Sequence, residues 1–195
     1  MKVVLASNNA HKVEELLQNL PSNISIVTMG DLGINSPEET GTTFVENAII
    51  KARYAAEQSG LAAIADDSGL EVDYLKGAPG IYSSRFAGIE ASDQQNNTKL
   101  LQELEGIPAA LRTARFRSII VMMKHKLDPT PIIVMGTWEG QILEKPRGGQ
   151  GFGYDPIFFI PSLNRTAAEL SQNEKTQYSH RGLALKQLNI ILAAN

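Results

Sequence analysis

The sequence has no cysteine, and its 195 residues include only three histidines. Without cysteine there is no disulfide, no thiolate zinc site and no cysteine nucleophile. The three histidines are scattered along the chain and do not form a transition-metal motif. An active site must therefore be built from carboxylates, amines, guanidinium groups, hydroxyls and amides.

Long hydrophobic runs and an excess of one charge are also missing. The apolar stretches fall well short of the roughly 20 residues that a membrane-spanning helix needs, and the first six residues do not have the plan of a signal peptide. The formal net charge of −3 provides no field for wrapping a nucleic acid, so a phosphate site must be local. We expect a cytoplasmic protein that binds neither nucleic acid nor a membrane.

What is present is an ordinary globular composition, 43% hydrophobic and 20% charged, with no repeat and no linker. Such a chain can bury one substantial core, in one domain or in two lobes. Helices are predicted from Val13 to a stop at Pro21, from Thr43 to Gly60, from Ser92 to before Gly106, and over roughly 182–193. Strand candidates are 3–6, 61–65, 70–74, 114–124 and 132–138. This mixed order predicts an α/β fold with a central twisted mixed β-sheet flanked by helices.

Two adjacent carboxylates, Asp66 and Asp67, stand where the apolar run 61–64 is expected to end as a buried strand. Carboxylates are costly to bury there unless a cation pairs with them or they transfer a proton. The tetrapeptide 66–69 therefore indicates a metal-assisted active site. A simple turn is the alternative, because Asp, Ser and Gly all favour turns.

The loop Ser7-Asn8-Asn9-Ala10-His11-Lys12 joins a predicted strand to a predicted helix. Its backbone N–H groups and the positive end of the helix dipole favour an anion such as phosphate. Lys12 in the first helical turn opposes the dipole by ~0.3–1 kcal/mol, and a bound anion would compensate for this. The alternative is a plain N-cap by Asn8 or Asn9 with Lys12 in solvent. The glycines of a P-loop are missing.

The pair Glu38 and Glu39 precedes the second predicted helix and could simply complement the dipole of that helix. Asn47 and Lys51 are four residues apart and share a face of the same helix. If this face borders the active site, Lys51 can meet a phosphate that Lys12 also contacts.

The segment 148–156 concentrates glycines around Phe152. A ring between two glycines has little local packing support, and rings presented in this way stack on nucleobases. Asp155 could accept hydrogen bonds from the ring N–H groups of a base. The alternative is a glycine-rich hairpin whose Phe152 is tucked into a neighbouring core.

Hydrogen-bond donors gather at the start of the last predicted helix, on Lys175, Ser179, His180 and Arg181. A purine with oxygen at its 6-position presents an acceptor there, whereas adenine presents an amino donor. Each unmade buried hydrogen bond costs roughly 1–3 kcal/mol, so a donor-rich pocket favours 6-oxo bases. Alternatively, Ser179 caps the helix while His180 and Arg181 are solvated.

Six motifs occur in order along nearly the whole chain. They are Ser7-x-Asn9-x-x-Lys12, Phe44-x-Glu46-Asn47-Ala48-x-x-Lys51-Ala52, Ala65-Asp66-Asp67-Ser68-Gly69-Leu70, Gly77-Ala78-Pro79-Gly80-Ile81-Tyr82-Ser83-x-Arg85, Gly151-Phe152-Gly153-Tyr154-Asp155-Pro156 and Ser179-His180-Arg181. As a set they resemble the inosine triphosphate pyrophosphatase family. The resemblance is closest to its bacterial branch, which hydrolyses the non-standard purine nucleotides dITP, ITP and XTP to the monophosphate and pyrophosphate.

The resemblance implies a role for each matching position. Mg²⁺ is held by Glu38 and Asp67, and Asp67 is also the general base. Substrate contacts fall on the loop Ser7 to Lys12, on Ser68, and in a base pocket made of Phe152, Gly153, Tyr154, Asp155, Lys175, His180 and Arg181. Asn8 and His11 stand where glycines are commoner in the family, although asparagine tolerates the left-handed backbone region.

We therefore expect one domain spanning 1–195, with two lobes and the active site in the cleft between them. Its expected function is Mg²⁺-dependent pyrophosphohydrolysis of ITP, dITP and XTP, and the resemblance implies a homodimer. Two alternatives remain. One is a related pyrophosphatase for pyrimidine or modified nucleotides, and the other is a non-catalytic nucleotide or RNA sensor.

Overall fold

The computed structural model describes residues 1–7, 9–21 and 23–194. The chain folds into two compact units. Unit 1 comprises Met1–Ser68, Ser118–Gly136 and the segment from His180 onward, and unit 2 comprises Gly69–Arg117 and Thr137–Ser179. Three long strands pass from one unit into the other along the chain.

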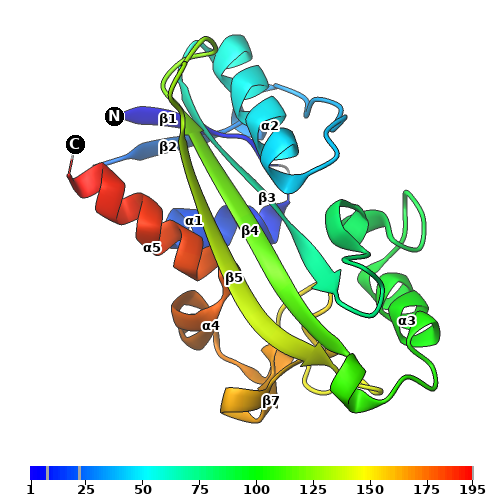
Figure 1. The fold of residues 1–195 in the computed structure, drawn as a ribbon. Helices are drawn as coiled ribbons and strands as arrows, with labels where there is room; N and C mark the ends of the chain where they lie inside the picture. The colour runs from blue at the N-terminus through cyan, green and yellow to red at the C-terminus, as the bar shows by residue number, and fades with distance from the viewer. Residues whose placement is uncertain (8, 22, 195) are drawn as a thin grey trace. The chain divides into compact units, whose positions relative to one another are not determined.

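Within the described residues, seven strands form one sheet in the order β2-β1-β3-β4-β5-β6-β7. They are β1 (Lys2–Leu5), β2 (Ser25–Thr28), β3 (Ala62–Val72), β4 (Thr113–Met123), β5 (Ile132–Ile142), β6 (Phe158–Ile160) and β7 (Arg165–Thr166). β1 is parallel to β2 and β3, whereas β6 is antiparallel to β5 and β7. The sheet is therefore mixed, and with its flanking helices it confirms the predicted α/β fold (Figure 1).

The described α-helices are α1 (Ala10–Asn19), α2 (Phe44–Ser59), α3 (Asp93–Glu103), α4 (Gln172–Tyr178) and α5 (His180–Ala193). Short 3₁₀ turns cover Gly30–Leu32, Gly80–Arg85, Ala109–Leu111, Pro161–Leu163 and Ala167–Glu169. The start signals predicted at Thr43 and Ser92 are confirmed, because each forms a capping box, with Glu46 and Gln95 respectively. None of these helices is long and apolar enough to cross a membrane.

The remaining differences from the predicted elements are small. The last helix begins at His180, two residues before the predicted start. Four of the described strands and α-helices were not predicted: β2, β6, β7 and α4. They contain four, three, two and seven residues, and segments so short carry too few turns or alternations to show a period.

Unit 1 has helices on both faces of its part of the sheet. Ala63 and Ala65 of β3 pack with α2, whereas Ile64 packs with α1 and α5. Because side chains alternate along a strand, α2 covers one face, and α1 with α5 covers the other. The Asn189 side chain of α5 donates to the Asn19 carbonyl of α1 at 2.7 Å, and Figure 1 shows these two helices side by side in red and blue.

Unit 2 has a separate aromatic core. The Phe158 ring of β6 has its centroid 4.6 Å from that of Phe116 on β4 and 5.4 Å from that of Trp138 on β5. Leu100 of α3 and Tyr154 pack into the same cluster. The loop 148–156 therefore leads directly into this core through Tyr154.

Strand β3 corrects the prediction at Asp66 and Asp67. We predicted a strand end there, with separate strands at 61–65 and 70–74, but β3 is continuous from Ala62 to Val72. The alternative of a simple turn is wrong for the same reason. The strand can continue because both carboxylates are paired with cations from neighbouring helices and so can be buried.

Candidate active site

Asp66 and Asp67 are consecutive residues of β3, and they are only 1% and 6% exposed. By strand alternation, Asp66 shares the face of Ile64, toward α1 and α5, and Asp67 shares the face of Ala65, toward α2. The two carboxylates therefore have different partners. Unit 1 contains two charged clusters instead of one pair of carboxylates.

Asp66 accepts hydrogen bonds from hydroxyls and lies between two cations. Its Oδ2 is 3.0 Å from Lys12 Nζ and 3.4 Å from Arg181 Nη2. Ser118 Oγ donates to Oδ1 at 2.5 Å, and Ser68 Oγ donates to Oδ2 at 3.2 Å. Burial would raise the pKa of Asp66, but Lys12 and Arg181 outweigh burial and hold this pKa well below its usual range. Asp66 is a buried, ionised anchor for both cations.

Lys12 lies in the first turn of α1, as predicted. Asn9 caps this helix by accepting from the Lys12 backbone N–H at 3.1 Å, and Ser7 Oγ accepts from the Asn9 N–H at 3.3 Å. The Lys12 side chain is only 17% exposed and pairs with Asp66, so the N-cap is confirmed and the solvated lysine is wrong. The pKa of Lys12 is lowered because burial outweighs the attraction of Asp66.

Arg181 is 2% exposed and is held inside unit 1. Its Nη1 donates to the Glu15 carboxylate of α1, and its Nη2 donates to Ser68 Oγ at 2.9 Å. Burial would lower the pKa of Arg181, but Asp66 and Glu15 outweigh it and raise this pKa. The predicted alternative of a solvated arginine is therefore wrong. Its Nε is buried and has no hydrogen-bond partner among the described residues.

Gly136 of β5 permits a close approach of α5. A Cβ at this position would overlap the His180 carbonyl oxygen and would lie 2.8 Å from the Ala184 backbone nitrogen. His180 itself is buried, 8% exposed. A lone glycine inside a strand is a known signal of such an approach, and it was not used in predicting the site.

Lys51 joins two carboxylates on the α2 side. Its Nζ is 2.6 Å from Asp67 Oδ1 and 3.1 Å from Glu39 Oε1. Burial raises the pKa of Asp67 and outweighs Lys51, which lowers it. Burial would lower the pKa of Lys51, but Asp67 and Glu39 outweigh it and raise this pKa. Asp66 and Asp67 are thus sequence neighbours whose pKa values are displaced in opposite directions.

The loop before α2 places Glu39, and not Glu38, on Lys51. Asn47 Oδ1 accepts from the Gly41 N–H at 2.8 Å, and a Cβ at Gly41 would lie 2.6 Å from the same oxygen. The loop is therefore drawn against the first turns of α2. With this path Glu39 contacts Lys51, and Glu38 is exposed. Sequence reasoning missed Glu39 because adjacent residues of a loop carry no signal of which one faces inward.

A divalent cation fits the cluster of Asp67, Lys51 and Glu39 by the chemistry of its oxygen atoms. Mg²⁺ takes oxygen ligands and binds through one or two carboxylates together with substrate phosphates and water. Asp67 and Glu39 already share the single positive charge of Lys51. Among the residues that the structure describes, no three His, Cys, Asp or Glu side chains form a metal site by themselves. A metal bound here would complete its coordination with substrate or water.

In unit 2, the loop 148–156 forms a second polar cluster around Asp155. The Oδ2 of Asp155 accepts from the buried Lys175 Nζ and from the Phe152 backbone N–H, the latter at 3.0 Å. Lys175 Nζ also lies 5.5 Å from the centroid of the Phe152 ring. Phe152 is half-buried, and Tyr154 is the aromatic residue of the loop that enters the core. This arrangement favours a presented Phe152 over one tucked into a core.

The predicted site residues are divided between the units. Unit 1 holds the loop from Ser7 to Lys12 together with Glu38, Lys51, Asp67, Ser68, His180 and Arg181, and unit 2 holds Phe152, Gly153, Tyr154, Asp155 and Lys175. Lys12, Ser68 and Arg181 meet at Asp66, whereas Ala10 and His11 are exposed. Asn8 lies outside the described residues. The partners Glu15 and Ser118 were also missed, because they come from distant positions in the sequence.

One strand, β3, carries both buried carboxylates, and the lysines that pair with them come from α1 and α2. The chain is thus an α/β protein with a candidate site built from carboxylates and lysines. The profile of the Ham1 family matches residues 3–190. The chain belongs to the Ham1 family.

Individual relatives extend over nearly the whole chain. The chain is 57% identical over 188 residues to a protein from Vibrio vulnificus (strain YJ016) named dITP/XTP pyrophosphatase, covering 96% of this chain and 94% of that one. It is 56% identical over 194 residues to a protein of the same name from Vibrio parahaemolyticus serotype O3:K6, covering 99% and 97%. A solved HAM1 protein from Coxiella burnetii superposes with a TM-score of 0.94 at 48% identity, covering 100% of both chains.

Proposed function

We propose that this chain is a nucleoside triphosphate pyrophosphohydrolase that converts dITP, ITP and XTP to the monophosphate and pyrophosphate. Membership of the Ham1 family and relatives named dITP/XTP pyrophosphatase support this substrate class. The structural observation that carries the proposal is the separation of the two buried carboxylates, with Asp66 paired to Lys12 and Arg181 and Asp67 paired to Lys51. The pKa of Asp66 is lowered and that of Asp67 is raised in agreement with these environments. Two carboxylates whose environments shift their pKa values in opposite directions are typical of active sites in which one stays ionised and the other accepts a proton.

The triphosphate is expected to bind where α1 begins. This end of α1 carries the positive end of the helix dipole, and Lys12 is held there by Asp66. Lys51 supplies a second positive charge beside Asp67. Together the two lysines reduce the repulsion between the phosphates and a nucleophile, and they stabilise the charge that develops on the leaving pyrophosphate.

Asp67 is the proposed general base. It accepts a proton from water while the water oxygen bonds to the α-phosphorus. The bond from that phosphorus to the bridging oxygen breaks, and its electron pair leaves with pyrophosphate. Burial raises the pKa of Asp67 and so makes it a better proton acceptor than an ordinary carboxylate.

Mg²⁺ is the proposed cofactor, and when bound it would screen the phosphate charges. The sequence resemblance assigns it to Asp67 and Glu38. Of the pair Glu38 and Glu39, Glu39 is the residue that shares Lys51 with Asp67. We therefore propose that either Glu38 or Glu39 is the second carboxylate ligand. Substitution of each residue in turn can show which one it is.

We assign base selection to Phe152, Gly153, Tyr154, Asp155 and Lys175 of unit 2, and we keep His180 and Arg181 of unit 1 as substrate contacts that the family resemblance implies. Phe152 supplies a half-buried ring for stacking, and Lys175 supplies a buried donor beside it. A homodimer and a cytoplasmic location complete the proposal.

The test is release of pyrophosphate by the purified chain from ITP, dITP, XTP, GTP and ATP, with and without Mg²⁺. We expect turnover of the first three nucleotides in Mg²⁺ and a much lower kcat/KM for ATP, whose 6-amino group cannot accept from the donors of the pocket. GTP, which carries the 6-oxygen, shows how far other positions of the base contribute. Preferential turnover of pyrimidine or modified nucleotides would show that the chain is a related pyrophosphatase with another substrate class. Nucleotide binding without pyrophosphate release would show that it is a non-catalytic sensor.

A further inference from the structure

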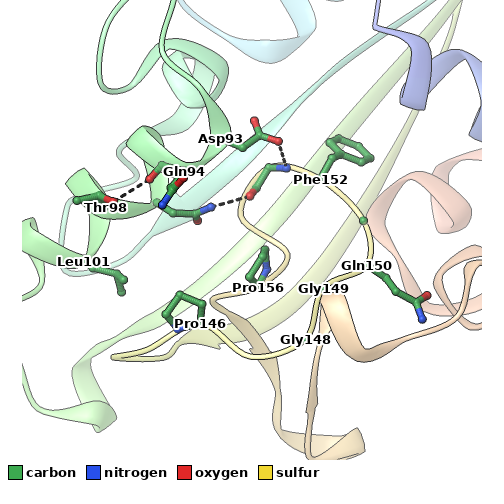
Figure 2. A pocket seen from close by; sticks show the side chains of 13 residues that line it. Asp93, Gln94, Thr98, Leu101, Pro146, Gly148, Gly149, Gln150, Phe152 and Pro156 are labelled. Atoms are coloured by element: carbon green, nitrogen blue, oxygen red, sulfur yellow. Dashed lines mark hydrogen bonds between the residues drawn. The ribbon is translucent and has the colours of Figure 1, made fainter.

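Two side chains of α3 hold one residue of the loop 148–156, Gly153, through the peptide groups on either side of it. Asp93 Oδ2 accepts from the Gly153 N–H at 2.6 Å, and Asn97 Nδ2 donates to the Gly153 carbonyl oxygen at 2.8 Å. Figure 2 draws both bonds, with Asp93 directed at the loop beside Phe152. Because Asp93 and Asn97 are four residues apart, they lie on the same face of the helix.

Packing leaves open space beside Gly153, although Gly148 and Gly151 of the same loop are crowded. A cavity of about 410 Å³ lies between the first half of α3 and the loop, bordered by residues that include Leu101, Pro146 and Phe152 (Figure 2). A Cβ built at Gly153 would meet no atom within 4 Å, and the same is true at Gly149. With open space beside Gly153, hydrogen bonds are its main support, and both of those to its own N–H and carbonyl oxygen come from α3.

The neighbouring residues of the loop have anchors of another kind. The Tyr154 hydroxyl, in the core, donates to the Ser83 carbonyl oxygen at 2.8 Å, and the Phe152 N–H donates to Asp155. The Gly153 carbonyl oxygen is held by Asn97 of α3. The Phe152–Gly153 peptide is held at its N–H by Asp93 of α3 and at its carbonyl oxygen by the Asp155 N–H, the latter at 3.3 Å. The direction in which the Phe152 ring points follows from the orientation of that peptide.

Donation to the Gly153 carbonyl oxygen is the hydrogen bond that explains an asparagine at position 97. Asn97 is 9% exposed, and its Oδ1 is buried without a hydrogen-bond partner among the described residues. A buried amide oxygen with no partner is costly. An apolar residue at this position would avoid that cost, but it would leave the Gly153 carbonyl without its donor.

We propose that Asp93 and Asn97 are positioning residues that set nucleobase selection by orienting the Phe152–Gly153 segment. The proposal rests on the proposed function, in which Phe152 stacks on the base. Neither side chain needs to touch the nucleotide. Their substitution acts on base recognition and leaves the chemistry at Asp67 unaltered.

The kinetic test compares Asp93→Ala and Asn97→Ala with the unmodified chain, with ITP and ATP as substrates. Loss of one hydrogen bond should raise KM for ITP about 10-fold and lower the ITP-to-ATP ratio of kcat/KM by a similar factor. The kcat for ITP should change by less than about 3-fold. Asp93→Asn keeps an acceptor oxygen while removing the charge, and it should restore the ratio.

A matched control is Gln94→Ala. Gln94 is an exposed neighbour on α3 that borders the same cavity, and among the described residues its side chain makes no bond to Gly153. Its ratio of kcat/KM values should equal that of the unmodified chain. Equal losses on ITP and ATP in Asp93→Ala would overturn the proposal, since they would indicate a general structural defect.

Amide hydrogen exchange of the peptide covering 148–156 tests the positioning without any activity. Exchange at this segment should be faster in Asp93→Ala and Asn97→Ala, and unchanged in Gln94→Ala, at equal thermal stability of unit 2. Unchanged exchange in Asp93→Ala would overturn the proposal even in an active enzyme. If no nucleotide released pyrophosphate, the proposed function would be wrong. The hydrogen-exchange result would still show whether Asp93 and Asn97 hold the segment 148–156 in position.

Discussion

Asp66 and Asp67 are consecutive in β3, yet each pairs with a lysine from a different helix on a different face of the sheet. Asp66 meets Lys12 of α1 at 3.0 Å, and Asp67 meets Lys51 of α2 at 2.6 Å. The strand therefore gives two neighbouring carboxylates two environments. One is held as a permanent anion, and the pKa of the other is raised.

Asp66→Asn should destabilise the protein strongly. It leaves Lys12 and Arg181 facing a neutral amide, and breaking a buried pair in this way costs about 3–5 kcal/mol. Asp67→Asn is the isosteric control, because burial already disfavours its charge. We expect its free energy of unfolding to change by about 1 kcal/mol or less. Urea unfolding measures the free energy of unfolding of both variants. Equal losses of stability would contradict the different roles of Asp66 and Asp67.

Gly136→Ala should displace the first turn of α5, because the added Cβ overlaps the His180 carbonyl oxygen. Overpacking of this kind costs about 1–3 kcal/mol, and movement of His180 and Arg181 should lower kcat/KM for ITP. Gly149→Ala is the control, since a Cβ there meets no atom within 4 Å. Thermal unfolding and pyrophosphate release should separate the two variants, and indistinguishable behaviour would refute the close approach.

Glu39→Ala should weaken the binding of Mg²⁺ more than Glu38→Ala does. Glu39 shares Lys51 with Asp67, whereas Glu38 is exposed. The Mg²⁺ concentration for half-maximal pyrophosphate release should rise about 10-fold or more in Glu39→Ala. A larger rise in Glu38→Ala would return the ligand to the residue that the family resemblance assigns.

Glu174, in the helix that carries Lys175, should titrate far below an ordinary glutamate. Arg165 Nη2 at 2.5 Å and the Ser171 N–H at 2.9 Å lower the pKa of Glu174 from 4.5 to about 2. Since the folded pKa is below the unfolded one, this stabilisation is complete above pH 4.5 and is lost as the pH falls toward 2. NMR titration of the carboxyl carbon measures the value. Arg165→Gln should return it toward 4.5, and a normal pKa in the unmodified chain would exclude the effect.

The helix starts and the cluster residues were predictable because their signals are local. Thr43 with Glu46 and Ser92 with Gln95 have capping-box spacing, and both boxes form. Lys12 and Lys51 were identified from their positions in helices next to carboxylates or a polar loop. Each of these inferences needs only residues within about one helical turn.

The division of roles between Asp66 and Asp67 was not predictable in the same way. Strand alternation places neighbours on opposite faces, but we ended the strand before Asp66 because unpaired carboxylates are costly to bury. The partners of Asp66, which are Lys12, Ser118 and Arg181, lie 52 or more residues away in sequence. Long-range pairing of this sort leaves no pattern in a single sequence. The hydrogen bonds from Asp93 and Asn97 of α3 to Gly153 were unpredictable for the same reason.

The central claim is that Asp67 removes the proton from the attacking water. Pyrophosphate release from ITP by Asp67→Asn, measured beside equilibrium binding of ITP in Mg²⁺, tests it most directly. We expect kcat to fall by a factor of about 10² to 10⁴ while the dissociation constant changes by only a few-fold. Turnover equal to that of the unmodified chain would contradict the claim and remove Asp67 from the mechanism.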